Sequence, residues 1–279
     1  MQNRAIHPDR YCVHQVTLME QCDFRESLEA LSRHGIHRTA VWKDKLDGLS
    51  LSDARHQLDN NGVEAIAYCV GGLFCFREDK RFRQAMDDNR QRIEQALALG
   101  ATSMVVITGG VEDFGCDLRG ARLRMLEGLG ELTGLARDAG LRLALEPLHP
   151  MVCGNRSVLT TLGEANNALD QLDSDDVLSI ALDTYACWWD PNLEADIKRA
   201  AHRISNLHVS DWLLDTTDTR LDRGMPGDGI IDNRRIRGLL EAQGFTGAVE
   251  VEIFSARNWW KRPADDVLHT ILERYATAL

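Results

Sequence analysis

The segment LRLALEP, residues 141–147, is a short strand-like run of mainly apolar residues that ends in a carboxylate, Glu146. Three later segments have the same form: VLSIALDT reaches Asp183, ISNLHVSD contains His208, and AVEVEIFS contains Glu252. A charged group at the end of an apolar strand is costly to bury unless a counter-charge compensates it, and a divalent cation is the simplest compensation. These four residues are therefore candidate ligands of one metal ion.

The type of ligand indicates the type of metal. Three carboxylates and one imidazole form an oxygen-rich set, which suits Mn²⁺, Mg²⁺ or Co²⁺ better than a structural zinc site. We expect one divalent ion, with Mn²⁺ as the first choice and Mg²⁺, Co²⁺ or Zn²⁺ as alternatives.

Strand-like and helix-like segments alternate along the whole chain. Strands are expected at 11–18, 36–42, 63–70, 102–108, 141–146, 177–183, 204–211 and 247–255. Helices are expected at 23–35, 51–61, 80–99, 118–139, 159–172 and 233–243, with two more opened by Pro191 and Pro263. Several strands are continuous apolar runs, which is typical of a parallel sheet that is covered on both faces.

Eight βα units in this length predict an α/β fold, a (β/α)₈ TIM barrel, as a single domain over residues 1–279. A doubly wound open sheet is the alternative, but it calls for a glycine-rich phosphate turn after the first strand, and QVTLMEQCD offers none. Active sites of barrels lie at the carboxyl ends of the strands. Glu146, Asp183, His208 and Glu252 are then neighbours around one rim.

Composition limits the partners. The 279 residues carry a formal net charge of −11, which argues against nucleic acid and against an anionic membrane surface as partners. The first residues lack a signal-type apolar core, and no apolar stretch approaches a membrane span. The seven cysteines are odd in number, are scattered and form no CxxC, so we expect reduced thiols in a cytoplasmic protein. Those cysteines are Cys12, Cys22, Cys69, Cys75, Cys116, Cys153 and Cys187.

The segments LALEPLHP, ALDTYACWWDP, LHVSDW and VEVEIF resemble the sugar phosphate isomerase/epimerase family, which has a xylose isomerase-like TIM barrel. The resemblance implies that Glu146, Asp183, His208 and Glu252 bind one divalent metal ion. It also implies that the two glutamates, Glu146 and Glu252, move the proton, as they do in the ketose epimerase members. The family includes epimerases, isomerases, inosose dehydratases and dehydroshikimate dehydratases, so membership indicates fold and metal better than substrate.

One position departs from the family pattern. Ketose epimerases usually carry a histidine three residues after the metal-binding aspartate, where it helps to hold the substrate, and this chain has Ala186 there. The departure weakens a ketose 3-epimerase assignment and leaves the predicted metal site intact. A homo-oligomer is only what the resemblance implies.

Each predicted ligand has an ordinary structural alternative. Glu146 and Glu252 are alternatively strand-end carboxylates paired with an arginine, Asp183 a helix N-cap, and His208 a core histidine whose hydrogen bonds are satisfied. Glu250 shares the alternation of Glu252 and is expected to face inward too, deeper in the barrel.

Four further residues are candidates for substrate binding. His149 either orients a substrate oxygen or lies on the loop surface, and Asp211 either contacts substrate or a ligand, or caps a loop. Arg223, in the glycine-rich stretch DRGMPGDGIID, either binds an oxyanion or is a solvated loop residue. Trp188, like Trp189, Trp259 and Trp260, either stacks on a sugar ring or fills a packing gap or subunit interface.

These residues predict a metal-dependent isomerase or epimerase that acts on a sugar, keto-sugar or cyclitol by proton transfer through an enediolate. A metal-dependent dehydratase of the inosose or 3-dehydroshikimate type is the alternative on the same site. The absence of a phosphate loop favours a non-phosphorylated substrate. A hydrolase resembling endonuclease IV fits less well, because it would need more strand-end histidines and a basic groove. A non-catalytic metal-stabilised scaffold or subunit is kept open by Ala186.

Overall fold

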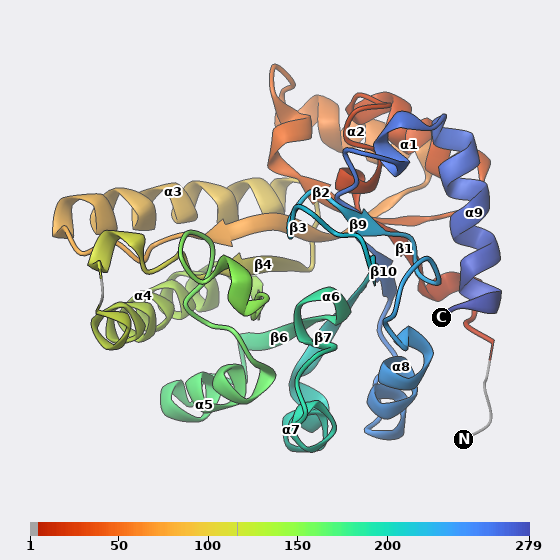
Figure 1. The fold of residues 1–279 in the computed structure, drawn as a ribbon. Helices are drawn as coiled ribbons and strands as arrows, with labels where there is room; N and C mark the ends of the chain where they lie inside the picture. The colour runs from red at the N-terminus through yellow and green to blue at the C-terminus, as the bar shows by residue number, and fades with distance from the viewer. Residues whose placement is uncertain (1–4, 116) are drawn as a thin grey trace.

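Eight parallel strands curve into a nearly closed barrel, and helices surround it (Figure 1). The computed structural model describes residues 5–115 and 117–279, so Cys116 and its expected reduced thiol lie outside the described residues. The sheet order is β1-β10-β7-β6-β5-β4-β3-β2. The strands are β1 (Tyr11–Val13), β2 (Arg38–Trp42), β3 (Glu64–Gly72), β4 (Ser103–Ile107), β5 (Arg142–Leu145), β6 (Leu178–Asp183), β7 (Ile204–Val209) and β10 (Val249–Val251).

The seam between β1 and β2 is bridged by side chains rather than by a backbone ladder. The Thr39 hydroxyl donates to the carbonyl oxygen of Val13 over 2.7 Å, and the backbone N–H of Trp42 donates to the side-chain oxygen of Gln15 over 3.2 Å. These bonds bring the two end strands together and complete the barrel. The predicted (β/α)₈ barrel is therefore confirmed.

The helices begin and end where the sequence supplies capping groups. Asp23 and Glu26 form a capping box at the start of α1, and Gly62 and Gly140 end α2 and α4 in the left-handed conformation that glycine adopts without strain. The helices are α1 (Phe24–Arg33), α2 (Leu51–Asn61), α3 (Asp79–Ala98), α4 (Leu118–Ala139), α5 (Leu162–Leu172), α6 (Thr184–Cys187), α7 (Leu193–Ala200), α8 (Asn233–Ala242) and α9 (Ala264–Thr277).

Two expected strands are shorter than the sequence suggested. The expected strand 11–18 ends at Val13, and Gln15–Leu18 form a 3-10 helix, because the Thr17 N–H turns back to the carbonyl oxygen of His14. The expected strand 247–255 pairs only over Val249–Val251. Beyond it, the Ile253 N–H donates to the Thr17 hydroxyl, so that a side chain replaces the missing strand partner.

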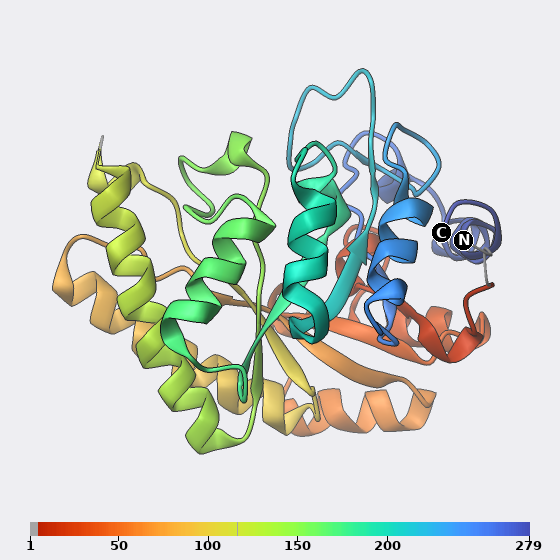
Figure 2. The same cartoon turned by 90° about the horizontal axis from the view of Figure 1, so that it is seen from below.

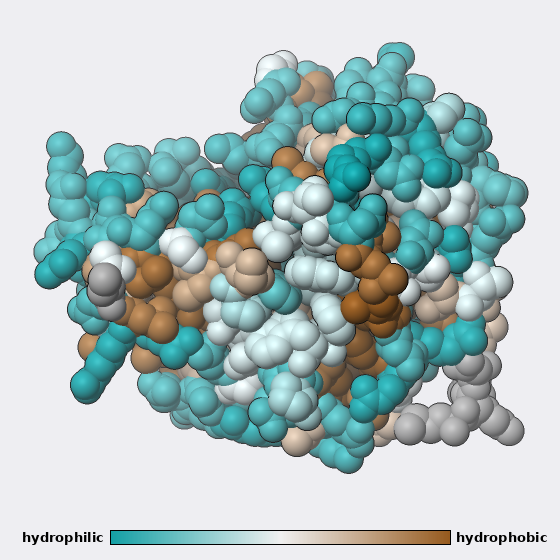
Figure 3. Space-filling model, in the orientation of Figure 1, coloured by the Kyte–Doolittle hydropathy of each residue, from teal (hydrophilic) through white to brown (hydrophobic). Residues whose placement is uncertain are grey.

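Three small elements were not expected. Residues Thr184–Cys187 form the single-turn helix α6 directly after β6, and β8 (Asp211–Trp212) pairs antiparallel with β9 (Arg223–Gly224). The loop between β8 and β9 rises above the carboxyl ends of the strands (Figure 2). Figure 3 shows the face onto which these ends open, with hydrophilic residues along most of its edge and hydrophobic patches nearer the middle.

The interior is filled in two layers. The larger apolar cluster lies between the sheet and the helices, and a smaller one inside the barrel includes Ala67, Val105, Ala144 and Ala181. Short side chains at these positions leave room along the barrel axis for polar groups. Among the described residues, no helix is long and apolar enough to cross a membrane.

Candidate active site

The four predicted ligands lie at the carboxyl ends of four strands that are adjacent in the sheet. Glu146 follows β5, Asp183 ends β6, His208 lies in β7 and Glu252 follows β10. All four side chains are buried, with at most 4% of each residue exposed. The register places Asp183 directly beside His208, so residues that are far apart in sequence share one rim.

Three of the four come within range of one ion. Ligand atoms of Glu146, His208 and Glu252 all lie within 4.8 Å of one another, and His208 Nδ1 is 2.8 Å from Glu146 Oε1. Asp183 is joined to this group through Arg223, whose Nη1 is 3.0 Å from Asp183 Oδ2 and 2.9 Å from Glu252 Oε2. A positive group thus already lies where the carboxylates converge.

The structural alternatives considered for Asp183 and Glu252 are also present in the site. Asp183 Oδ1 accepts a hydrogen bond from the Tyr185 N–H over 2.8 Å, which makes Asp183 the N-cap of α6, and Glu252 does pair with an arginine. Both oxygens of each carboxylate have a partner in the protein, and each oxygen keeps a further lone pair that could bind an ion. Buried carboxylates and an imidazole at this spacing suit a divalent ion, and Glu146, His208 and Glu252 are the residues that would hold it.

The two glutamates have opposite electrostatic environments. Burial raises the pKa of Glu146, although the neighbouring His208 partly offsets the effect. Burial acts on Glu252 in the same direction, but the hydrogen bond from His14 and the charge of Arg223 outweigh it and lower the pKa of Glu252 well below its ordinary value. Two carboxyl groups whose pKa values are pushed apart can act as an acid and a base at the same pH.

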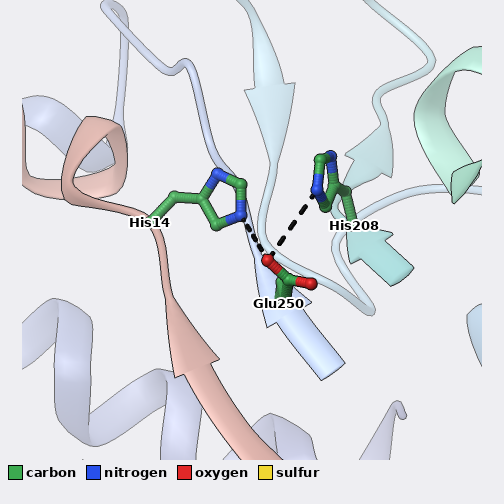
Figure 4. Close-up of side chains that lie close together, drawn as sticks. All are labelled: His14, His208 and Glu250. Atoms are coloured by element: carbon green, nitrogen blue, oxygen red, sulfur yellow. Dashed lines mark hydrogen bonds and ion pairs between the residues drawn. The ribbon is translucent and has the colours of Figure 1, made fainter. Parts of the chain in front are cut away.

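A polar network lies beneath this rim, and Figure 4 shows three of its members, His14, His208 and Glu250, with their side chains pointing toward one another. His14 Nε2 is 3.0 Å from Glu250 Oε2, and His14 Nδ1 is 3.2 Å from Glu252 Oε1. Burial disfavours the charged imidazole, but the hydrogen bonds to Glu250 and Glu252 prevail and raise the pKa of His14 to about 10. His14 therefore bridges the two carboxylates and holds their positions.

Glu250 is held from below as well. The Asn206 amide donates to Glu250 Oε1 over 2.9 Å, and both residues also line a pocket at the amino end of the barrel. His14, His208 and Glu250 form a second group within 4.8 Å. The inward direction of Glu250 was expected from strand alternation, whereas His14 was not singled out. His14 follows β1, whereas the sequence placed it inside the expected strand 11–18, so the rule that found the four ligands did not reach it.

A pocket opens above Glu146 and Glu252, and both carboxylates line it. His149, Arg223 and Ala186 line it, so two of the four predicted substrate-binding residues face this space. The His149 ring nitrogen Nδ1 accepts from the Met151 N–H over 3.2 Å, and burial lowers the pKa of His149.

The remaining two predicted substrate-binding residues lie elsewhere. The Asp211 carboxylate accepts hydrogen bonds from the N–H groups of Gly227 and Ile231, both over 2.8 Å, and so fixes the hairpin loop, as its capping alternative describes. Trp188 packs near Trp212, with 5.9 Å between ring centroids, and is not part of the described pocket lining. The aromatic wall of the pocket comes instead from Trp42, Tyr185 and Phe254, which sequence reasoning missed.

The family model of the xylose isomerase-like TIM barrel matches residues 26–273. The chain belongs to this family. Among curated relatives of this xylose isomerase-like barrel, an inosose isomerase of Halalkalibacterium halodurans is 23% identical over 94% of the chain and 93% of the relative. An inosose isomerase of Bacillus velezensis is 24% identical, with 95% of each protein covered.

Solved structures agree with the fold. A protein of Sinorhizobium meliloti 1021 superimposes with a TM-score of 0.93 at 40% identity, over 98% of this chain and 99% of that one. The IOLI protein, crystallised with a zinc atom, gives a TM-score of 0.84 at 21% identity, over 96% and 97%. D-psicose 3-epimerase from Clostridium cellulolyticum H10, solved with D-tagatose, gives 0.78 at 16% identity, over 97% and 99%. Isomerases and epimerases are thus named among the relatives and structural neighbours of this chain.

Proposed function

We propose that the protein is a divalent-metal-dependent isomerase or epimerase of a sugar, keto-sugar or cyclitol. The observation that carries the proposal is the convergence of two buried glutamates at one pocket, beside an imidazole within metal-binding distance. The name of the inosose isomerases at 23% and 24% identity supports the substrate class.

The residues of the chain divide the work between them. One of the two glutamates, Glu146 or Glu252, takes a proton from the carbon beside a carbonyl group, and the other returns one to the substrate. Return to the opposite face of the same carbon is epimerisation, and return to the adjacent carbon is isomerisation.

Glu146, His208 and Glu252 would hold the metal, with Asp183 as the proposed fourth ligand. A bound divalent ion supplies a Lewis acid that polarises the carbonyl group and stabilises the negative charge of the enediolate. Manganese remains our first choice from the ligand chemistry, and the zinc atom of the IOLI protein makes zinc the first alternative to test.

Around this centre, the protein positions and shields the substrate. Arg223 directs its guanidinium between Asp183 and Glu252, where it can also bind a substrate oxygen. Trp42 and Phe254 form an apolar wall that excludes water and can pack against the C–H face of a sugar. Ala186 leaves this side of the pocket without the histidine of the ketose epimerases, which favours a substrate other than a ketose for 3-epimerisation.

A dehydratase is the second candidate for the same site. If a hydroxyl group lies on the carbon next to the enediolate, its loss competes with reprotonation, and His149 at the pocket wall is placed to assist that departure. The reaction then releases water rather than a rearranged isomer.

An NMR screen in D₂O tests both candidates. The protein, supplied in turn with Mn²⁺, Mg²⁺, Co²⁺ and Zn²⁺, is mixed with ketoses, inososes and 3-dehydroshikimate. Deuterium incorporation identifies the carbon acid, and loss of water separates a lyase from an isomerase. A metal-binding protein that exchanges no C–H proton on any of these substrates would contradict the proposal and favour a non-catalytic scaffold.

A further inference from the structure

We propose that the substrate carries an anionic group, a carboxylate or a phosphate, and that Arg156 and Arg220 bind it at the mouth of the pocket. The inference rests on the proposed function, because it assigns a substrate class to the same site. It narrows the expected sugar or cyclitol to one with an oxyanion at the end remote from the reacting carbon.

The Arg156 side chain lines the pocket without a protein partner for its guanidinium among the described residues. It lines the same pocket as Glu146 and Glu252 and is half-buried, yet its guanidinium makes no hydrogen bond or ion pair with any residue in 5–115 or 117–279. Burial is the main cause that lowers the pKa of Arg156; the charges of Arg220 and Arg223 act in the same direction, and the carboxylates of Glu146 and Glu252 oppose them. Since no described carboxylate contacts the Arg156 guanidinium directly, its hydrogen-bond donors are available to an anionic ligand.

The loop that carries Arg156 is braced rather than free. The Gly109 N–H donates to the carbonyl oxygen of Arg156 over 3.0 Å, and the Val158 N–H donates back to that of Gly109 over 2.9 Å. Gly110 lies so close to the loop that a Cβ there would come within 2.2 Å of the Gly154 carbonyl oxygen. The end of β4 therefore supports this loop and fixes the backbone from which Arg156 extends into the pocket.

Arg220 approaches from the other side, on the loop between β8 and β9. It also lines the pocket, and its guanidinium lies 5.8 Å from the centroid of the Phe254 ring. The Asp218 carboxylate nearby accepts from the backbone N–H of Arg220 over 2.8 Å and makes no described ion pair with its side chain. Two guanidinium groups on different loops, neither in an ion pair with a described residue, thus face one opening.

Charge balance favours an anion over a neutral ligand. Arg223 pairs with Asp183 and Glu252, and Glu146 contacts His208, so the three carboxylates of the site already have partners. His14 pairs with Glu250 beneath them. Within the described lining no further carboxylate remains to pair with the two arginines at the mouth. An oxyanion on the substrate would complete the balance and receive charge-assisted hydrogen bonds.

The test uses three hexuloses with one carbon skeleton. D-fructose, D-fructuronate and D-fructose 6-phosphate differ at C6, which carries a hydroxyl, a carboxylate or a phosphate group. Calorimetry measures their dissociation constants with wild-type protein, both metal-free and loaded with Mn²⁺. We expect one of the anionic hexuloses to bind about 10- to 100-fold more tightly than D-fructose, because the free energy of a hydrogen bond to a charged group changes a dissociation constant by about this factor. Whichever anion is preferred identifies the carboxylate or the phosphate class.

Three variants locate the effect. Arg156→Gln and Arg220→Gln each remove one guanidinium at the mouth. Either variant should reduce the ratio of the dissociation constant of D-fructose to that of the preferred anionic hexulose about tenfold. Arg137 lies on α4 and forms an exposed ion pair with Asp176. Arg137→Gln removes the same charge away from the pocket and should leave this ratio unchanged. Arg220 lies on an exposed loop, so its variant keeps the test usable if Arg156→Gln fails to fold.

The outcomes separate this inference from the proposed function. Equal affinities for the three hexuloses, no binding of either anion, or a preference that both pocket variants retain would overturn the anion site even if deuterium exchange on neutral sugars is observed. An anion preference that depends on Arg156 or Arg220, with no exchange on any substrate in the screen, would support the anion site and count against the isomerase.

Discussion

The two halves of the barrel mouth differ in chemistry. The ends of β5, β6, β7 and β10 carry Glu146, Asp183, His208 and Glu252, whereas on the opposite side Trp42, Val70 and Ile107 of β2, β3 and β4 line the pocket with apolar surface. One fold therefore supplies a charged half and an apolar half around a single opening. The apolar half matters for the charged one, because electrostatic interactions strengthen where water is excluded.

The largest expected effect comes from the charged half. Glu146→Gln and Glu252→Gln keep the shape of each side chain but remove its ability to carry a proton, so we expect deuterium exchange on the substrate to fall by about 10²–10⁴-fold. Glu64→Gln, at the opposite, amino end of β3, replaces an exposed glutamate and is the matched control. Exchange that persists in both site variants would show that the charged half does not perform the proton transfer.

The next effect tests the support beneath the charged half. His14→Ala leaves Glu250 and Glu252 without their shared donor, and removing one partner of a buried ion pair costs about 3–5 kcal/mol of unfolding free energy. Urea unfolding measures the loss, and His56→Ala on the exposed face of α2 is the control. The double variant His14→Ala/Glu250→Ala should lose less than the sum of its single variants. Strict additivity would mean that the two residues act independently.

Metal removal sharpens the comparison further. A ligand present at 100 times its dissociation constant stabilises the fold by about 2.7 kcal/mol, so we expect chelation to lower Tm by on the order of 5 °C. The thermal shift should be regained with Mn²⁺ in the wild type and not in His208→Ala, which lacks one of the three clustered ligands. A shift of equal size in the wild type and in His208→Ala would place the ion elsewhere.

The smallest effect concerns His149, which lines the pocket and is partly shielded from water, as the residues of the apolar half are. Because burial lowers the pKa of His149, the unfolded chain binds its proton more readily, and stability falls as the pH drops below the unfolded value of about 6.5. Urea unfolding at pH 7.5 and 5.5 should show His149→Asn gaining stability relative to the wild type at the lower pH. A relative change in the opposite direction would contradict this, and His56→Asn controls for loss of an exposed imidazole.

The charged half could largely be placed from the sequence. Glu146, Asp183, His208 and Glu252 each follow an apolar run with clear turn signals after it, and parallel strands bring such positions to one rim. Glu250 followed from the two-residue alternation of β10. Their roles as ligands and proton carriers, the domain bounds, the compartment and a homo-oligomer stay predictions.

The residues that were missed depend on tertiary contacts. His14 was read as the middle of a strand over 11–18, and only the turn after Val13 reveals it as a strand-end residue. Arg156 reads as an ordinary loop arginine, because its place depends on the contact between its loop and Gly109. Asp211 has the residue type of a substrate contact, but its two carboxylate oxygens accept hydrogen bonds from the backbone N–H groups of Gly227 and Ile231. Such long-range pairings leave no local pattern in a single sequence.

The stack of Asn206, Glu250, His14 and Glu252 links the two openings of the barrel through consecutive contacts. Most barrels fill this interior with layers of branched aliphatic side chains, which tolerate exchange as long as volume is kept. Here each member needs its neighbour's donor or acceptor, so substitutions in the interior would have to occur in matched sets. Efforts to make this barrel more heat-resistant should therefore leave its axis alone and work on the helices outside.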